Sequence, residues 1–197
     1  MKTLAPMIAA ASLFVAPAAA NAQAFVQVET GLDVVSAEGD SKTDIGYGGT
    51  IGYDMPLSSG MFVGVQATYA DSATKWCVRD VAEAGDKACL EAGRDVAALI
   101  RVGTAVGPQG KLYLMGGYAN ARAELSYSGD SLDAIGDYYG VDIGGVKAHS
   151  DLDGFRLGAG YEHALNEKFF VKAEYRYSNY EMGVSRHNGM VALGAKF

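Results

Sequence analysis

The chain has 197 residues, a length that suits a single domain. Its 23 acidic residues outnumber its 16 basic ones, and the resulting net charge of −7 argues against a nucleic-acid partner, which calls for a basic patch. Glycine (26) and tyrosine (12) are abundant and proline (4) is scarce, a composition that suits strands with close backbone packing and an interfacial aromatic belt.

The first 22 residues have the pattern of a secretory signal peptide. Lys2 is their only charge and precedes an apolar run, 4–16, and the segment ends in Ala20-Asn21-Ala22. A charged start, an apolar middle and an A-x-A end predict cleavage after Ala22, or alternatively after Ala24. The prolines and the small-residue exit argue against a transmembrane anchor. We expect 23–197 to form one exported domain with 15 basic and 23 acidic residues.

The remaining chain is dominated by apolar residues that alternate with polar or small ones. This period of two recurs in segments of about ten residues, as the strands of a membrane barrel require. The alternation predicts eight strands, at about 26–34, 45–55, 61–69, 95–106, 112–123, 155–162, 171–178 and 190–197.

The fifth of these segments, 112–123, has the least regular alternation. Asn120 and Arg122 share one parity, whereas Tyr113, Met115 and Ala119 share the other. Since polar residues suit the lumen of a membrane barrel, we expect Asn120 and Arg122 to point inward and the other three to point outward.

The connections alternate between short and long. Short turns rich in turn-forming residues are predicted at 56–60, 107–110 and 165–168. Longer polar stretches are predicted at 36–43, 71–94, 124–150 and 179–187. Outer-membrane barrels have this asymmetry, with short periplasmic turns and long external loops.

The polar parity of the strands carries ionised side chains, and their direction decides the class of barrel. A soluble lipocalin-like barrel would place the apolar parity inside and the charges in water. A membrane barrel has the reverse arrangement, with apolar side chains toward lipid and charges toward the lumen. The candidate lumen charges are Glu29, Arg101, Arg156, Glu162, Lys172, Glu174 and Arg176.

Three features favour the membrane barrel. Complete first and last strands allow the sheet to close, so that no strand edge is left in hydrocarbon. The chain ends on Phe197, at the tip of an alternating strand. Tyrosines on the apolar parity lie near predicted strand ends, as an aromatic girdle requires. They are Tyr53 and Tyr161 beside short turns, and Tyr47, Tyr69, Tyr175 and Tyr177 beside longer stretches. We therefore predict an all-β fold, an eight-stranded antiparallel transmembrane β-barrel.

A resemblance to a known family supports this prediction. The terminal aromatic residue looks like the signal read by the outer-membrane barrel assembly machinery. Together with 154–161, 171–177 and 186–189, it resembles the OmpA-like, OmpX-like and opacity-type small outer-membrane barrels, often labelled the porin family. The resemblance covers the whole mature chain. It implies location in the outer membrane of a Gram-negative cell, contact with its lipid and lipopolysaccharide, and assembly through the strand that ends at Phe197.

The seven candidate lumen charges have two interpretations. An eight-stranded barrel is only just wide enough for its inward side chains to fill it. We therefore expect a paired network that closes the interior, because an unpaired charge is costly to bury. The alternative is a gated ion path or narrow pore.

The longer stretches carry the candidate partner sites. Cys77 and Cys89 in an exported chain predict a disulfide that either rigidifies a loop or presents a binding epitope. Their spacing is not C-x-x-C and no histidine is adjacent, which argues against a redox or metal site. The stretch 124–150 is acidic and carries tyrosines, which suit contact surfaces. We expect any extracellular ligand to contact 71–94 and 124–150.

The chain has no recognisable catalytic or cofactor motif. His149, His163 and His187 are scattered, without G-x-S-x-G or H-E-x-x-H. Ser185-Arg186-His187 does not match the H-x-S motif of lipid A deacylases. The sequence predicts a non-enzymatic outer-membrane protein that supports the membrane and displays loops for adhesion or interaction. The alternative is a small porin passing water, ions or small solutes.

Overall fold

The structure is a computed structural model that describes residues 23–37, 39–80, 84–129, 138 and 145–197. The predicted signal peptide, 1–22, lies outside the described residues. Most of the described chain is β-strand, and this part contains no helix long and apolar enough to cross a membrane.

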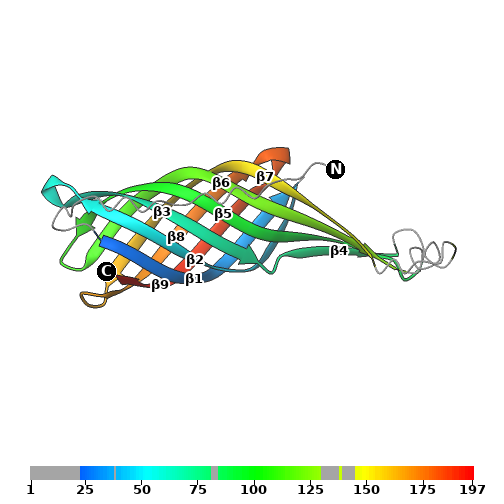
Figure 1. Ribbon diagram of the computed structural model, residues 1–197, viewed down its shortest axis with the longest axis horizontal. Coiled ribbons are helices and arrows are strands. Elements are labelled where there is room, and N and C mark those ends of the chain that lie inside the picture. The colour runs from blue at the N-terminus through cyan, green and yellow to red at the C-terminus, as the bar shows by residue number, and fades with distance from the viewer. Residues whose placement is uncertain (1–22, 38, 81–83, 130–137, 139–144) are drawn as a thin grey trace, which may run out of the picture.

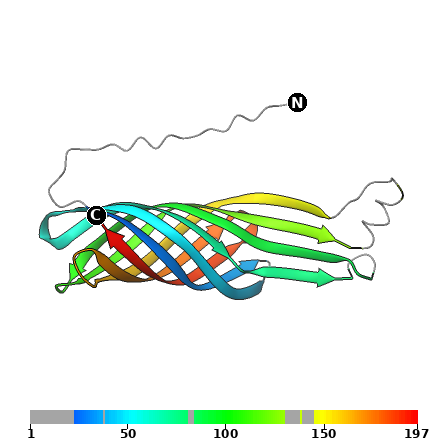
Figure 2. The same ribbon diagram turned by 60° about the horizontal axis from the view of Figure 1, so that its bottom comes forward.

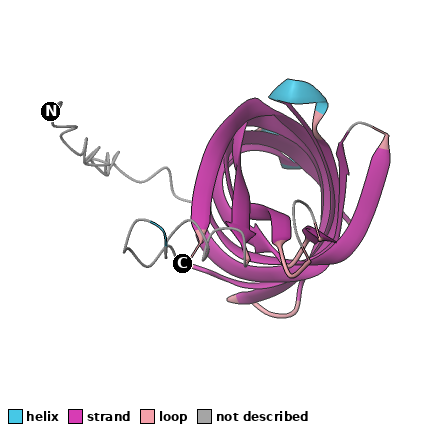
Figure 3. Cartoon of the chain, turned by 90° about the vertical axis from the view of Figure 1, so that its right-hand side faces the viewer, coloured by secondary structure: helices cyan, strands magenta, loops and turns pink. Residues whose placement is uncertain are grey.

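Eight strands form a closed antiparallel wall. They are β1 (Gln23–Ala37), β2 (Asp40–Pro56), β3 (Met61–Ser72), β5 (Lys87–Val106), β6 (Gly110–Ser128), β7 (Val146–Ala164), β8 (Phe169–Tyr180) and β9 (Ser185–Lys196). Each pairs with its neighbour along the chain, and β1 also pairs with β9, so the sheet has no free edge around its circumference (Figure 3). The predicted eight-stranded barrel is confirmed.

Short connections join the strands at one end of the barrel, as predicted at 56–60, 107–110 and 165–168. At the other end, the strands run further than the sequence predicted. β1 and β2 stay paired up to Ala37 and Asp40, and β8 and β9 up to Asn179 and Ser185. The prediction of longer loops at 36–43 and 179–187 was therefore wrong. The reason is that the alternation of polar and apolar residues ends where both faces of a strand lie in water, whereas the backbone pairing of the strands continues beyond that point.

Three strands project beyond the wall at this second end (Figures 1 and 2). β5, β6 and β7 have 20, 19 and 19 residues, whereas β3, β8 and β9 have 12 each. Pairing of β3 with β5 ends at Asp95, and pairing of β8 with β7 ends at Gly154. The short strand β4 (Lys75–Arg79) pairs with the projecting part of β5. We call β4 and residues 87–94, 122–128 and 146–153 the extension.

The two faces of the wall are assigned as the membrane-barrel hypothesis requires. Glu174 and Arg176 on β8 are 6% and 2% exposed. Tyr175, which lies between them, is 54% exposed, and Val171, earlier on the same strand, is 37% exposed. Charged side chains therefore occupy the interior and apolar side chains form the outer surface. A lipocalin-like barrel would have the opposite arrangement.

The expected facing of the fifth predicted strand was wrong. Tyr113, Met115 and Ala119 are at most 5% exposed and face the lumen, whereas Asn120 and Arg122 lie on the outer wall. The reason is that β6 extends past the membrane-facing part of the wall. There Asn120 donates to Asp153 (2.8 Å), so an outward polar side chain does not contact lipid.

A layer of aromatic rings fills the lumen near the short turns. Phe25, Phe62, Tyr113 and Phe170 are each at most 4% exposed. Each ring lies against an inward glycine directly opposite it on a neighbouring strand, where an added Cβ would overlap the ring. The pairs are Phe25–Gly52, Phe62–Gly103, Tyr113–Gly160 and Phe170–Gly194. Covering a strand glycine with a facing ring is a known way to fix strand register.

The aromatic layer predicts the cost of adding one methyl group. Gly194→Ala should destabilise the barrel by about 1–3 kcal/mol, because the Phe170 ring must move within a filled interior. Gly189→Ala on the same strand is the matched control, since nothing lies within 4 Å of its added Cβ. Urea unfolding in lipid vesicles measures both, and equal stabilities for the two variants would contradict the layer.

Candidate functional site: the lumen and the extension

The outer cluster of lumen charges lies next to the extension and joins β1, β5, β7 and β9. Arg186 contacts Asp33 (2.5 Å) and Asp95 (3.0 Å), and Arg156 also contacts Asp95 (2.7 Å). The Tyr180 hydroxyl donates a hydrogen bond to Asp95 (2.5 Å). Two carboxylates and two guanidinium groups thus balance one another in charge.

The central cluster is built around Arg176. Its guanidinium donates to both carboxylate oxygens of Glu29, at 2.5 and 2.7 Å, and to Glu174 from Nε at 2.8 Å. Gln27 and Thr50 donate further hydrogen bonds to Glu29, and the Tyr113 hydroxyl donates one to Glu174. Charge-assisted bonds of this bidentate kind are strong and fix the geometry of both partners.

The turn-end cluster combines cations with the aromatic layer. Arg101 lies 3.5 Å from Asp54 and 3.6 Å from Glu162, and Lys172 lies 3.4 Å from Glu162. The Arg101 guanidinium also lies 4.0 Å from the centre of the Tyr113 ring, and the Lys172 ammonium 4.0 Å from that of Phe25. Cation–π attraction adds to ion pairing when the groups are desolvated in this way.

All seven residues proposed for the lumen point into it, but the structure divides them among the three clusters. Arg156 belongs to the outer cluster, Glu29, Glu174 and Arg176 to the central one, and Arg101, Glu162 and Lys172 to the turn-end one. Six charged partners were not among the proposed residues, namely Asp33, Asp54, Asp95, Lys111, Arg186 and Lys196. The three aspartates share the inward parity of predicted strands, which was a usable signal. Arg186 fell in a stretch predicted as loop.

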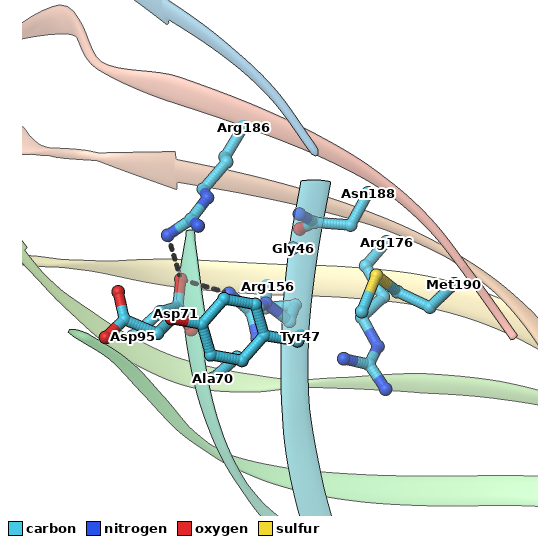
Figure 4. Close-up of a pocket in the computed structure, with 10 residues that line it drawn as sticks. All are labelled: Gly46, Tyr47, Ala70, Asp71, Asp95, Arg156, Arg176, Arg186, Asn188 and Met190. Carbon is cyan, nitrogen blue, oxygen red and sulfur yellow. Dashed lines mark hydrogen bonds and ion pairs between the residues drawn. The ribbon is translucent and has the colours of Figure 1, made fainter. Parts of the chain in front are cut away.

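Figure 4 shows the residues that line the space between the outer and central clusters. A cavity of about 10 Å³ is lined by Asp95, Arg156, Arg176, Arg186 and their neighbours. Room for one water molecule requires roughly 10–15 Å³. This level of the lumen therefore has space for about one water rather than for a file of hydrated ions.

The outer wall carries the tyrosines proposed for the aromatic girdle. Tyr47, Tyr53, Tyr69, Tyr161 and Tyr175 are exposed there, and Tyr177 is half-buried. Tyr177 packs against the rings of His187 (4.9 Å) and Phe155 (6.4 Å), and the Tyr175 hydroxyl shares a 2.6 Å hydrogen bond with His187. Tyr118 is also exposed on this wall and was missed because the facing of β6 was wrong.

The extension has a polar outer face. Cys77 and Cys89, directly opposite each other on β4 and β5, form the predicted disulfide. Arg122 (2.9 Å) and Arg94 (3.2 Å) both contact Asp151 on β7. The hydrogen bond from Arg122 lowers the pKa of the Asp151 carboxyl. No group of three or more His, Cys, Asp or Glu suited to a metal ion occurs among the described residues.

Comparison with known proteins identifies the family. Residues 7–197 match the outer membrane protein beta-barrel domain family. The chain belongs to this outer-membrane β-barrel family. It is accordingly an outer-membrane protein, and in this family the short turns face the periplasm while the longer connections lie outside the cell.

Solved structures of other outer-membrane barrels share the fold. Ail, the attachment invasion locus protein of Yersinia pestis, has a TM-score of 0.60 at 13% identity, over 89% of this chain and 99% of Ail. Neisserial surface protein A has a TM-score of 0.56 at 15% identity, over 88% and 97%. The N-terminal barrel of Pseudomonas aeruginosa OprF has a TM-score of 0.50 at 13% identity, over 90% and 100%. A search of curated proteins gives no match.

The central cluster predicts a large effect of removing its one cation. Arg176→Met should lower the free energy of unfolding by about 3–5 kcal/mol, because two buried carboxylates lose their partner. Arg122→Met, which removes an ion pair on the extension, should cost about 0–1 kcal/mol. Urea unfolding in lipid vesicles measures both. If the triple variant Glu29→Gln, Glu174→Gln, Arg176→Met recovers part of the free energy of unfolding, the loss in Arg176→Met is due to the unpaired carboxylates. Equal losses in Arg176→Met and Arg122→Met would contradict the prediction.

Proposed function

We propose that the protein is a closed, non-enzymatic membrane anchor that presents the extension as an interaction surface outside the cell. The observation that carries this proposal is the filled lumen. Arg101, Arg156, Arg176 and Arg186, the arginines of the three clusters, are at most 4% exposed and ion-paired within the barrel. A conducting pore would need mobile water beside such groups.

The extension supplies the surface for interaction. It continues three strands of the wall beyond the aromatic girdle, and the Cys77–Cys89 disulfide links its edge strand β4 to β5. An ordered surface loses little conformational entropy on binding, which favours affinity. The extension contains described parts of the two stretches predicted to bind a ligand, 71–94 and 124–150, whereas 81–83, 130–137 and 139–144 lie outside the described residues. Ail, the attachment invasion locus protein of Yersinia pestis, whose structure holds the heparin analogue sucrose octasulfate, offers a precedent for the fold alone.

Assembly through the last strand is part of the proposal. β9 pairs with β1 from Lys196 to Ser185 and so closes the wall, and the backbone N–H of Phe197 donates to Ala24 (2.9 Å). The Phe197 ring, just beyond the end of β9, is 80% exposed on the folded barrel, and we propose that this terminal aromatic residue is read by the barrel assembly machinery.

A conductance measurement separates the anchor from the porin alternative. Purified protein in planar lipid bilayers should give no reproducible current steps, because the three clusters fill the lumen. Steps whose size changes in Arg176→Met but not in Arg122→Met would favour the porin and overturn the closed barrel.

An adhesion measurement tests the interaction surface. Replacing 76–90 by two glycines should remove the β4–β5 tip while leaving the wall paired. Cells displaying this variant should bind immobilised extracellular matrix protein at least several-fold less than cells displaying the unaltered chain. A control variant with serines at periplasmic turn positions 107–109 should bind normally. Unchanged binding by the shortened variant, at equal surface amounts, would contradict the proposal.

A further inference from the structure

The polarity of the two faces reverses where the barrel passes into the extension. Within the wall the inner face is charged and the outer face is apolar. A register shift in β5 between Ala92 and Asp95 lies at the boundary. Beyond it, the residues that continue the inner face are mostly apolar, and they lie directly opposite one another across four strands. They include Trp76, Leu90, Leu125 and Ala148.

This apolar inner face forms one side of a cavity of about 540 Å³ at the outer mouth of the barrel. Leu90 and Leu125 remain 42% and 50% exposed in it. Met182 and Val184, from the short β8–β9 connection, and Ala37, at the end of β1, line the opposite side. Large apolar side chains left open in this way are a feature of ligand sites.

The dimensions of the cavity fit a small molecule better than a protein. Its volume lies within the roughly 300–1,000 Å³ that is usual for small-molecule sites. Twelve of the described residues line it, whereas a stable protein interface typically uses about 20–30 residues on each side. A small molecule with an apolar body is therefore the expected occupant.

The polar groups of the cavity select the head of that molecule. Asp40, at the start of β2, is the charged residue among the described residues that line the cavity, and His149 and Ser150 are the other polar ones. Lys42 lies beside the cavity rather than in its lining: its ammonium donates to the Lys75 carbonyl and lies 6.0 Å from the centre of the Trp76 ring. A carboxylate favours a cationic head and repels an anionic one. The net charge of the mature chain, −8, acts in the same direction.

We propose that this cavity, lined by Trp76, Leu90, Leu125 and Asp40, binds a small amphiphile with an apolar body and a cationic head, taken up from the external medium. Uptake from the bilayer is disfavoured because the opposite face of the extension is polar, with Arg94, Arg122 and Asp151 above the girdle. The site requires the extension to lie outside the membrane, but it does not require the adhesive role proposed above.

The chain provides its own reporter for this site. Trp76 lines the cavity and is the only tryptophan in the sequence. In phosphatidylcholine vesicles, octylamine should shift its emission to shorter wavelength in a saturable manner. Octanoate, of equal chain length, should bind at least tenfold more weakly. Asp40→Asn should weaken octylamine binding about tenfold and remove most of the difference between the two probes.

Variants of the apolar wall complete the test. Leu125→Gln, and independently Leu90→Gln in case one variant does not fold, should weaken octylamine binding at least tenfold. Val78→Gln is the matched control, since Val78 is an exposed residue of β4 that does not line the cavity.

An unsaturable shift of the Trp76 emission, or equal shifts in Leu125→Gln and Val78→Gln, would overturn the site. Equal affinity for octanoate would overturn the cationic head, and a shift that depends on protein density without probe would indicate a second copy of the chain instead. Unchanged adhesion by the shortened variant together with saturable octylamine binding by the unaltered chain would overturn the adhesive role and leave the cavity standing, and the reverse pair of results would overturn the cavity alone.

Discussion

The structure depends on one constraint, that every backbone N–H and C=O inside the hydrocarbon must have a hydrogen-bond partner within the protein. A sheet meets this demand only when its first and last strands pair, as β1 and β9 do from Phe25 to Ser36. Closure then gives each strand an outer face in lipid and an inner face in a narrow cylinder. The period of two in the sequence follows directly from these two environments.

Closure at eight strands also determines what the lumen must contain. Charged side chains that point inward have little water around them, so each needs a partner of opposite sign. Arg176 between Glu29 and Glu174, and Asp95 between Arg156 and Arg186, meet that need with contacts of 2.5–3.0 Å. The rings near the short turns fill the space that the inward glycines leave. The same side chains therefore both fix the register and close the barrel.

The sequence predicted the strands, their closure and the direction of the lumen charges because these depend on local alternation. It did not predict which charges meet, because Asp33 and Arg186 are 153 positions apart and become neighbours only when the sheet closes. The facing of β6 was wrong for a related reason. Asn120 and Arg122 were judged by polarity alone, whereas their environment depends on how far β6 continues in pairing with β5 and β7. At that level their side chains contact Asp153 and Asp151 on β7.

The height of β5, β6 and β7 has a further consequence for the surface outside the membrane. Apolar residues on the outer wall would face water there, and charged residues on the inner side would no longer be enclosed. The extension has the opposite assignment, with Arg122 and Asp151 outward and Leu90 and Leu125 inward, and the shift between Ala92 and Asp95 changes the parity of β5 at that level. A bulge of this kind moves every following side chain of its strand to the opposite face of the sheet. An anchor and an exposed apolar concavity can therefore be built from the same three strands.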